Sequence, residues 1–164
     1  MDCWTEVAYR VKVEHIQPFV TAAALVLKEE LGIDIERGEL SVANTDYTTR
    51  EVTVLIGITG QVEGTVLYGT DEAMAVNIVR ELTGEKKAIY DETCESAIAE
   101  LGNVISGRAA VLFENQGIDC TISPPTVIRG RGTIISTVNI TRLVIPLKTR
   151  LGELDVAVAL RERD

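Results

Sequence analysis

The chain has 164 residues, of which 46% are hydrophobic and 25% are charged. This length and composition predict one globular domain, residues 1–164, with enough apolar side chains for its own core. Twenty-five acidic residues against 16 Lys and Arg give a net charge of −9. Such a charge repels phosphate backbones and anionic lipid, so no nucleic acid or membrane partner is expected and a protein partner is favoured.

The cysteines and the single histidine argue against a metal site. Cys3, Cys94 and Cys120 form an odd set without a Cys-x2-Cys pair, and one histidine does not complete a zinc site. We therefore expect free thiols and no metal or cofactor of the protein's own. The first residues lack the pattern of a signal peptide, and no apolar run reaches membrane-spanning length, so we expect a cytoplasmic protein.

Apolar periodicity and turn residues predict the elements in chain order. Pro18 suits the first turn of an N-terminal helix, His15 lies near the start of this helix, and Gly32 ends it. Thr70 would cap a second helix. The predicted helices span residues 17–31, 70–82 and 92–115, and the predicted strands span residues 33–43, 51–59, 64–68, 120–123, 126–128, 133–140, 143–147 and 154–160. Helices alternating with hairpins favour an α+β domain whose helices pack on one extended, mainly antiparallel sheet.

A faint internal repeat supports this architecture. Gly32-Ile33-Asp34 after the first helix recurs as Gly117-Ile118-Asp119 after the third, and strand-like sequence follows both. A helix followed by several strands therefore occurs twice, which predicts a pseudo-symmetric domain. In this register Glu100 corresponds to His15 and Asn103 to Pro18, so any site built on these two polar residues exists once.

The predicted helix at 92–115 carries a polar stripe. At about 100° per residue, Ser96, Glu100, Asn103 and Gly107 lie within about 40° of one another. The side chains expected on the opposite, buried face are Ile98, Leu101, Ile105, Ala109 and Leu112. The side chains expected to flank the stripe are Ala99, Val104, Ser106, Ala110 and Val111, so Glu100 is the lone charge of a smooth surface typical of a docking face.

Spacing alone leaves a second interpretation open. The same helix could be buried on both sides, for example at a dimer contact, with Glu100 and Asn103 hydrogen-bonded inside the protein. Three polar residues at helical spacing recur by chance, so the stripe by itself does not decide between the two.

The stripe and the residues after it resemble a known family. Ser-x3-Glu-x2-Asn and Gly107 are followed by Ser123-Pro124 and by Thr126-Val-Ile-x-Gly130. This combination resembles the CheC/CheX/FliY family, bacterial chemotaxis phosphatases that act on the phosphorylated response regulator CheY. Members of the CheC and FliY types carry the motif in both halves, whereas this chain carries it once, as in the CheX type.

The resemblance implies roles for the stripe. Asn103 would hold a water in line with the phosphorus of a CheY-type receiver, Glu100 would pair with a lysine of that receiver, and both are expected to be catalytic residues. Ser96 and Gly107 would contact the partner, and Mg²⁺ would belong to the receiver. The family also implies a homodimer formed through an exposed sheet edge.

Two other functions stay open at this point. A non-catalytic adaptor could use the same helix face to bind a receiver or a flagellar-switch component without hydrolysis. An assembly protein could use the stripe as a subunit contact.

Overall fold

The computed structural model describes residues 3–86 and 89–163, with the backbone alone for residues 3–12. The helices are α1 (Cys3–Leu31), α2 (Glu72–Thr83) and α3 (Glu92–Asn115). The strands are β1 (Glu36–Arg37), β2 (Ser41–Val42), β3 (Asp46–Thr48), β4 (Val52–Gly60), β5 (Val62–Thr70), β6 (Cys120–Ile122), β7 (Thr126–Arg129), β8 (Ile134–Ser136), β9 (Leu143–Thr149) and β10 (Gly152–Glu162).

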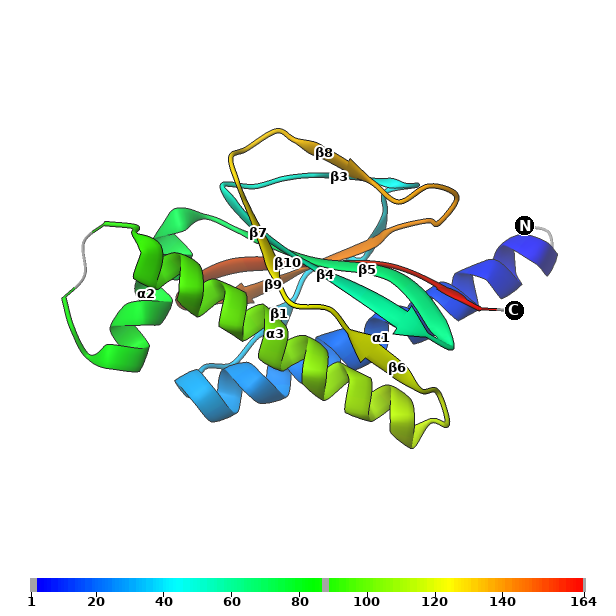
Figure 1. Cartoon of the computed structure of the whole chain (residues 1–164), viewed down its shortest axis with the longest axis horizontal. Helices are drawn as coiled ribbons and strands as arrows, with labels where there is room; N and C mark the ends of the chain where they lie inside the picture. Colours follow the sequence, from blue (N-terminus) through cyan, green and yellow to red (C-terminus); the bar gives the residue numbers. More distant parts are fainter. Residues whose placement is uncertain (1–2, 87–88, 164) are drawn as a thin grey trace.

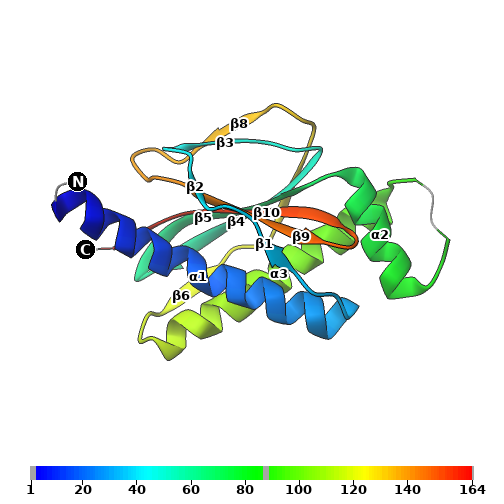
Figure 2. The same ribbon diagram turned by 180° about the vertical axis from the view of Figure 1, so that it is seen from behind.

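The larger sheet has the strand order β1-β9-β10-β5-β4-β6, with β2 beside β9 and β7 beside β4. Every described pairing is antiparallel. Helices α1 and α3 lie on one face of this sheet, and the two-stranded β3–β8 ribbon lies over the other (Figures 1 and 2). The predicted α+β class, with helices on an extended antiparallel sheet, is confirmed.

The main core fills the space between the helices and the sheet. Phe19 of α1 and Phe113 of α3 meet edge to face with ring centroids 5.8 Å apart, and both are fully buried. Burying an aromatic side chain of this size contributes about 1.5–3 kcal/mol. On the other face of the sheet, Tyr47 and Ile135 of the ribbon pack over Leu67 and Ala157. Both faces of the sheet are therefore covered.

The strand pairings give the fold an approximate two-fold symmetry. Strands β1 and β2 pair with β9, while their counterparts β6 and β7 pair with β4. The two-fold axis passes between β5 and β10, which pair with each other, and between β3 and β8, which also pair with each other. Gly32 and Gly117 follow the ends of α1 and α3 with φ of +65° and +81°, the left-handed conformation that glycine favours at helix ends. The predicted duplication is confirmed.

The first helix begins well before the predicted start. Helix α1 runs from Cys3, so Pro18 lies inside it instead of in its first turn. A proline inside a helix removes one backbone hydrogen bond and costs about 3 kcal/mol, which the buried neighbours Ile16 and Phe19 offset through packing. His15 is not a helix-start residue: it is buried, and its Nδ1 donates to the Leu160 carbonyl at 3.1 Å.

Three other predicted boundaries were wrong. Residues 33–43 contain only the two-residue strands β1 and β2, and residues 133–140 contain only β8. Thr70 ends β5, and Asp71 occupies the N-cap of α2, because the Thr70 hydroxyl donates across the sheet to the Glu153 carbonyl at 2.7 Å. None of the described helices combines the length and the apolar character needed to cross a membrane.

Candidate functional site

Helix α3 spans the predicted residues. The Asp91 side chain accepts hydrogen bonds from the backbone N–H groups of Thr93 at 3.0 Å and Cys94 at 3.2 Å. An N-cap of this kind contributes about 1 kcal/mol because it satisfies donors that the first helical turn leaves unpaired. The cap fixes where the helix begins, and therefore which side chains its outer face presents.

The inner face of α3 lies unusually close to the sheet at Gly102. A Cβ atom on Gly102 would lie 3.1 Å from Val54 Cγ1 and 3.2 Å from Tyr68 Cδ2. One turn later, the Ser106 hydroxyl and the Tyr68 phenol are hydrogen-bonded at 2.7 Å, and both side chains are fully buried. Burial raises the pKa of Tyr68 well above its usual value of 10.0. The helix is thus held against β4 and β5 by one glycine contact and one buried hydrogen bond.

This contact corrects one prediction and adds a residue that the sequence analysis missed. Ser106 was expected beside the exposed stripe, but it faces the core, where a small hydroxyl can pair with a buried phenol. Gly102 lies between Glu100 and Asn103 in the chain and was not selected as important. A glycine in the middle of a long helix was the available signal, because glycine destabilises a helix unless close packing requires it.

The predicted stripe lies on the outward ridge of α3. Ser96 and Glu100 are exposed, whereas Asn103 and Gly107 are partly exposed. Within the described part of the chain, neither the Glu100 carboxylate nor the Asn103 side-chain amide has a hydrogen-bond or ion-pair partner. Within the single chain the helix is therefore not buried on both sides, and the two polar groups are not bonded internally; burial of the stripe between two chains stays open. The exposed Glu100 and the partly exposed Asn103 lie one turn apart on α3.

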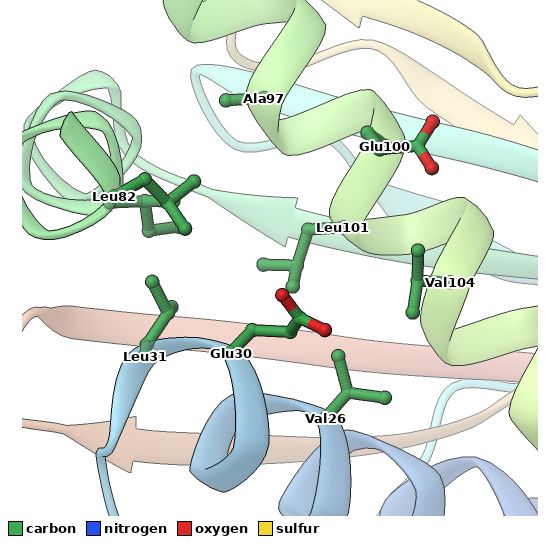
Figure 3. A pocket seen from close by; sticks show the side chains of 9 residues that line it. Val26, Glu30, Leu31, Leu82, Ala97, Glu100, Leu101 and Val104 are labelled. Carbon is green, nitrogen blue, oxygen red and sulfur yellow. The ribbon is translucent and has the colours of Figure 1, made fainter.

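Two hollows border the stripe. The first, named here the three-helix pocket, has a volume of about 280 Å³ and lies between α1, α2 and α3 (Figure 3). Its lining residues are Val26, Glu30, Leu31, Ile78, Leu82, Ala97, Glu100, Leu101 and Val104. The second hollow is formed by α3 and β7 and is lined by Glu92, Glu95, Ser96, Ala99 and Val127. Because Glu100 lines one hollow and Ser96 the other, the stripe forms a ridge between them.

Gly107 does not need to be glycine for internal packing. A Cβ atom added there would meet only Ile122 Cδ1, at 4.0 Å, which is an ordinary van der Waals contact. The helix is anchored nearby by Arg108, whose guanidinium binds the Glu29 carboxylate of α1 at 2.9 Å. A partner-facing role for Gly107 therefore stays a prediction, and packing against a strand does not explain it.

The Ser123-Pro124 part of the motif organises the sheet edge beside α3. The Ser123 hydroxyl accepts the Gly57 N–H at 2.8 Å, at the point where the chain passes from β6 to β7. Both strands pair with β4, and β7 brings Val127 against the outer side of α3. This segment therefore positions the surroundings of the stripe and does not carry reactive groups of its own.

The described side chains offer little to a metal ion. Within residues 13–86 and 89–163, no three His, Cys, Asp or Glu residues lie close enough to hold one. Cys94 and Cys120 are free thiols, with Cys94 buried as expected, while the thiol of Cys3 lies outside the described side chains.

The architecture and the match to a family model define the class. The fold is that of a CheC-like superfamily protein from a Shewanella species, whose crystal structure superimposes with a TM-score of 0.81 at 23% identity, over 91% of this chain and 98% of that one. The family model described as chemotaxis phosphatase CheX matches residues 52–148. The chain belongs to the CheX family of chemotaxis phosphatases.

Individual relatives agree with this membership. The CheY-P phosphatase CheX of Thermotoga maritima is 34% identical over 106 residues, which are 64% of this chain and 68% of that protein. The structure of a CheX–CheY–BeF3–Mg²⁺ complex from Borrelia burgdorferi is similar with a TM-score of 0.74 at 29% identity, covering 90% of this chain and 98% of that one. The predicted family and the predicted phosphatase class are confirmed, whereas the roles of individual residues remain predictions.

Proposed function

We propose that this protein hydrolyses the aspartyl phosphate of a CheY-type response regulator, using the outward ridge of α3. The single observation that carries the proposal is the pair Glu100 and Asn103, which leave adjacent turns of one rigid helix with no described internal partner. Membership of a phosphatase family supports it, as does the similarity to a CheX that was solved in complex with CheY.

The phosphatase itself needs to supply few reactive groups for this hydrolysis. An aspartyl phosphate is an acyl phosphate, so water attack on phosphorus breaks the bond to the carboxylate and releases inorganic phosphate. The receiver would supply Mg²⁺ and a lysine to balance the charge of the phosphoryl group. What remains is to hold one water in line with the leaving oxygen, and such positioning accounts for much of the catalysis of phosphoryl transfer.

Asn103 is proposed to hold that water. Its amide offers both a donor and an acceptor and does not titrate, so it can orient a water without acting as a base. The buried face of α3, fixed by Gly102 and by the Ser106–Tyr68 bond, keeps the amide in one place. A rigid support matters because an error of about 1 Å in positioning can reduce a rate about 100-fold.

Glu100 is proposed to pair with the receiver's lysine, one turn before Asn103. Ser96 would support this contact from the preceding turn, and Gly107 would let the partner approach the following one. Both carboxylate and amide must enter the receiver from the same helix face, which the three-residue spacing provides.

We also propose that the protein is a homodimer and that it lies in the cytoplasm, together with its receiver. The edge formed by β6 and β7 is a candidate for the dimer contact, because these strands have only three and four residues and pair with β4 on one side. Sedimentation at several concentrations checks the dimer, and a monomer at all of them would contradict it.

The test is the decay of a phosphorylated CheY-type receiver in Mg²⁺, alone and with this protein. The wild type is expected to speed the decay, and Asn103→Ala to lower the rate at saturation by about 100-fold while still binding, as for the loss of a single positioning donor. Asn115→Ala, an exposed amide at the end of the same helix, is the matched control and should retain full activity. Binding without faster decay in the wild type would instead indicate the adaptor function.

A further inference from the structure

The three-helix pocket beside Glu100 has an unusual combination of surfaces. Its walls are mostly apolar, with Leu82, Leu101 and Val104 among them. Two carboxylates complete its lining, Glu30 from α1 and Glu100 from α3; the Glu30 carboxylate lies next to Leu101, whereas that of Glu100 points away from the apolar side chains (Figure 3). The pocket is thus apolar inside and negative at its rim.

Neither rim carboxylate is neutralised within the described part of the chain. Glu29, the neighbour of Glu30, binds Arg108 at 2.9 Å, but no described cation lies within ion-pair distance of Glu30 or Glu100. An apolar occupant would remove water from two unpaired charges and would therefore be disfavoured. A metal ion is also a poor occupant, because no three His, Cys, Asp or Glu residues of the described part of the chain lie close enough together to hold one.

The pocket has room for one long side chain. Its volume of about 280 Å³ is close to the lower end of the roughly 300–1,000 Å³ that is typical of small-molecule sites. The pocket is also continuous with the ridge, because Glu100 belongs to both. A group that enters the pocket would therefore come from a protein already docked on α3.

We propose that the three-helix pocket binds a lysine or arginine side chain on the surface of the docked receiver, in addition to the contacts of the ridge. The inference rests on the proposed function. The methylene stem of such a side chain would lie against Leu82 and Leu101, while its charge would remain at the mouth beside Glu30, as long basic side chains do at apolar surfaces. Glu30 is then a partner-selecting residue on α1, outside the motif of α3.

The test measures binding of a receiver loaded with beryllofluoride and Mg²⁺, which imitates the phosphorylated state. Glu30→Gln is expected to weaken binding about 2- to 5-fold at low salt, the range of a single exposed ion pair, with the difference shrinking as salt rises. Glu114→Gln removes an identical exposed charge, also without a described ion-pair partner, near the end of α3 and away from the pocket, and is the matched control, so it should change binding less. Both variants should hydrolyse the bound aspartyl phosphate at the wild-type rate when saturated.

Two more variants test the remaining parts of the proposal. Leu82→Ala should weaken binding at all salt concentrations, and its side chain is already 51% exposed, so folding should be little affected. Glu30→Lys should repel the receiver's basic residue. Changing exposed Lys and Arg residues of the receiver to Glu, one at a time, should restore binding to Glu30→Lys at one position and so identify the occupant.

The outcomes separate this inference from the function on which it rests. If Glu30→Gln binds like the wild type while the wild type hydrolyses and Asn103→Ala does not, the pocket inference is wrong and the proposed function stands. If Glu30→Gln alters sedimentation of the protein alone and not receiver binding, the occupant is a second copy of the chain and the inference is wrong. If the wild type hydrolyses no receiver's phosphate, the proposed function fails and the inference fails with it.

Discussion

Replacing Gly102 and Gly107 of α3 by alanine, one at a time, should have opposite effects on stability. The two positions lie in the same helix interior, so alanine should favour the helical state by a similar amount at each, about 1 kcal/mol relative to glycine. What differs is the space for the new Cβ atom. At Gly107 the nearest atom is Ile122 Cδ1 at 4.0 Å, so nothing needs to move.

At Gly102 the new atom would press on two groups that cannot yield easily. Val54 is fully buried on β4, between β5 and the edge strands, and the Tyr68 ring is fixed by its hydrogen bond to Ser106. Contacts of 3.1 and 3.2 Å require a shift of a few tenths of an ångström, and overpacking of a core typically costs about 1–3 kcal/mol. After subtracting the gain in helix propensity, we expect Gly102→Ala to destabilise by up to about 2 kcal/mol.

Thermal and urea unfolding of the two variants against the wild type measures this difference. For a chain of this length, 1 kcal/mol corresponds to a shift in Tm of about 2–4 °C. We therefore expect Gly107→Ala to melt about 2–4 °C higher than the wild type and Gly102→Ala to melt lower. If Gly102→Ala is as stable as Gly107→Ala, the close approach of α3 to the sheet does not have the role described above.

The same pair of variants also reports on function. If Gly107 is needed for a close approach by the receiver, Gly107→Ala should bind it more weakly although the protein is more stable. Wild-type binding by this variant would instead show that Gly107 has no role in docking.

Three further predictions concern the elements that hold α3 and α1 in place. Tyr68→Phe should destabilise by about 1–3 kcal/mol because it leaves the buried Ser106 hydroxyl unpaired, and Ser106→Ala in the same protein should recover part of that loss, as measured by urea unfolding. Asp91→Ala should lower stability by about 1 kcal/mol through loss of the N-cap, whereas Asp91→Asn should lose less, and equal losses would contradict the capping role. Burial lowers the pKa of His15 below 6.5, so on acidification the unfolded chain takes up a proton at this residue before the folded chain does. The stability of the wild type relative to His15→Gln should therefore be constant above about pH 7 and fall on acidification through pH 6.5. A stability difference that does not change with pH in this range would contradict the lowered pKa of His15.

The sequence predicted α3 and its stripe well because every local signal agreed. Gly117 after the helix and a regular apolar period within it indicated its extent, and Asp91, which the sequence analysis did not use, caps its start. The orientation of the stripe followed from the period, since a helix with one apolar face has little choice about which side meets the sheet.

The errors occurred where distant residues decide the structure. Pro18 was interpreted as a helix start, but packing of α1 against the sheet carries the helix through it. Thr70 has the chemistry of an N-cap, yet its hydroxyl is used by the carbonyl of Glu153, 83 residues later in the chain. The close contact at Gly102 depends on side chains of β4 and β5, which periodicity within α3 does not report.

The strand order also has a consequence for how the chain folds during synthesis. Strand β10 lies in the interior of the sheet, between β9 and β5, and its register with β5 runs over eight residue pairs from Asp155 to Glu162. A ribosome delivers β10 after all of the other strands, so until then β4 and β5 form a hairpin whose outer edge is unpaired. Hydrogen-bonding groups on such an edge invite pairing with other chains. Closure of the sheet, and with it a firm support for α3, must therefore wait for the last strand to emerge.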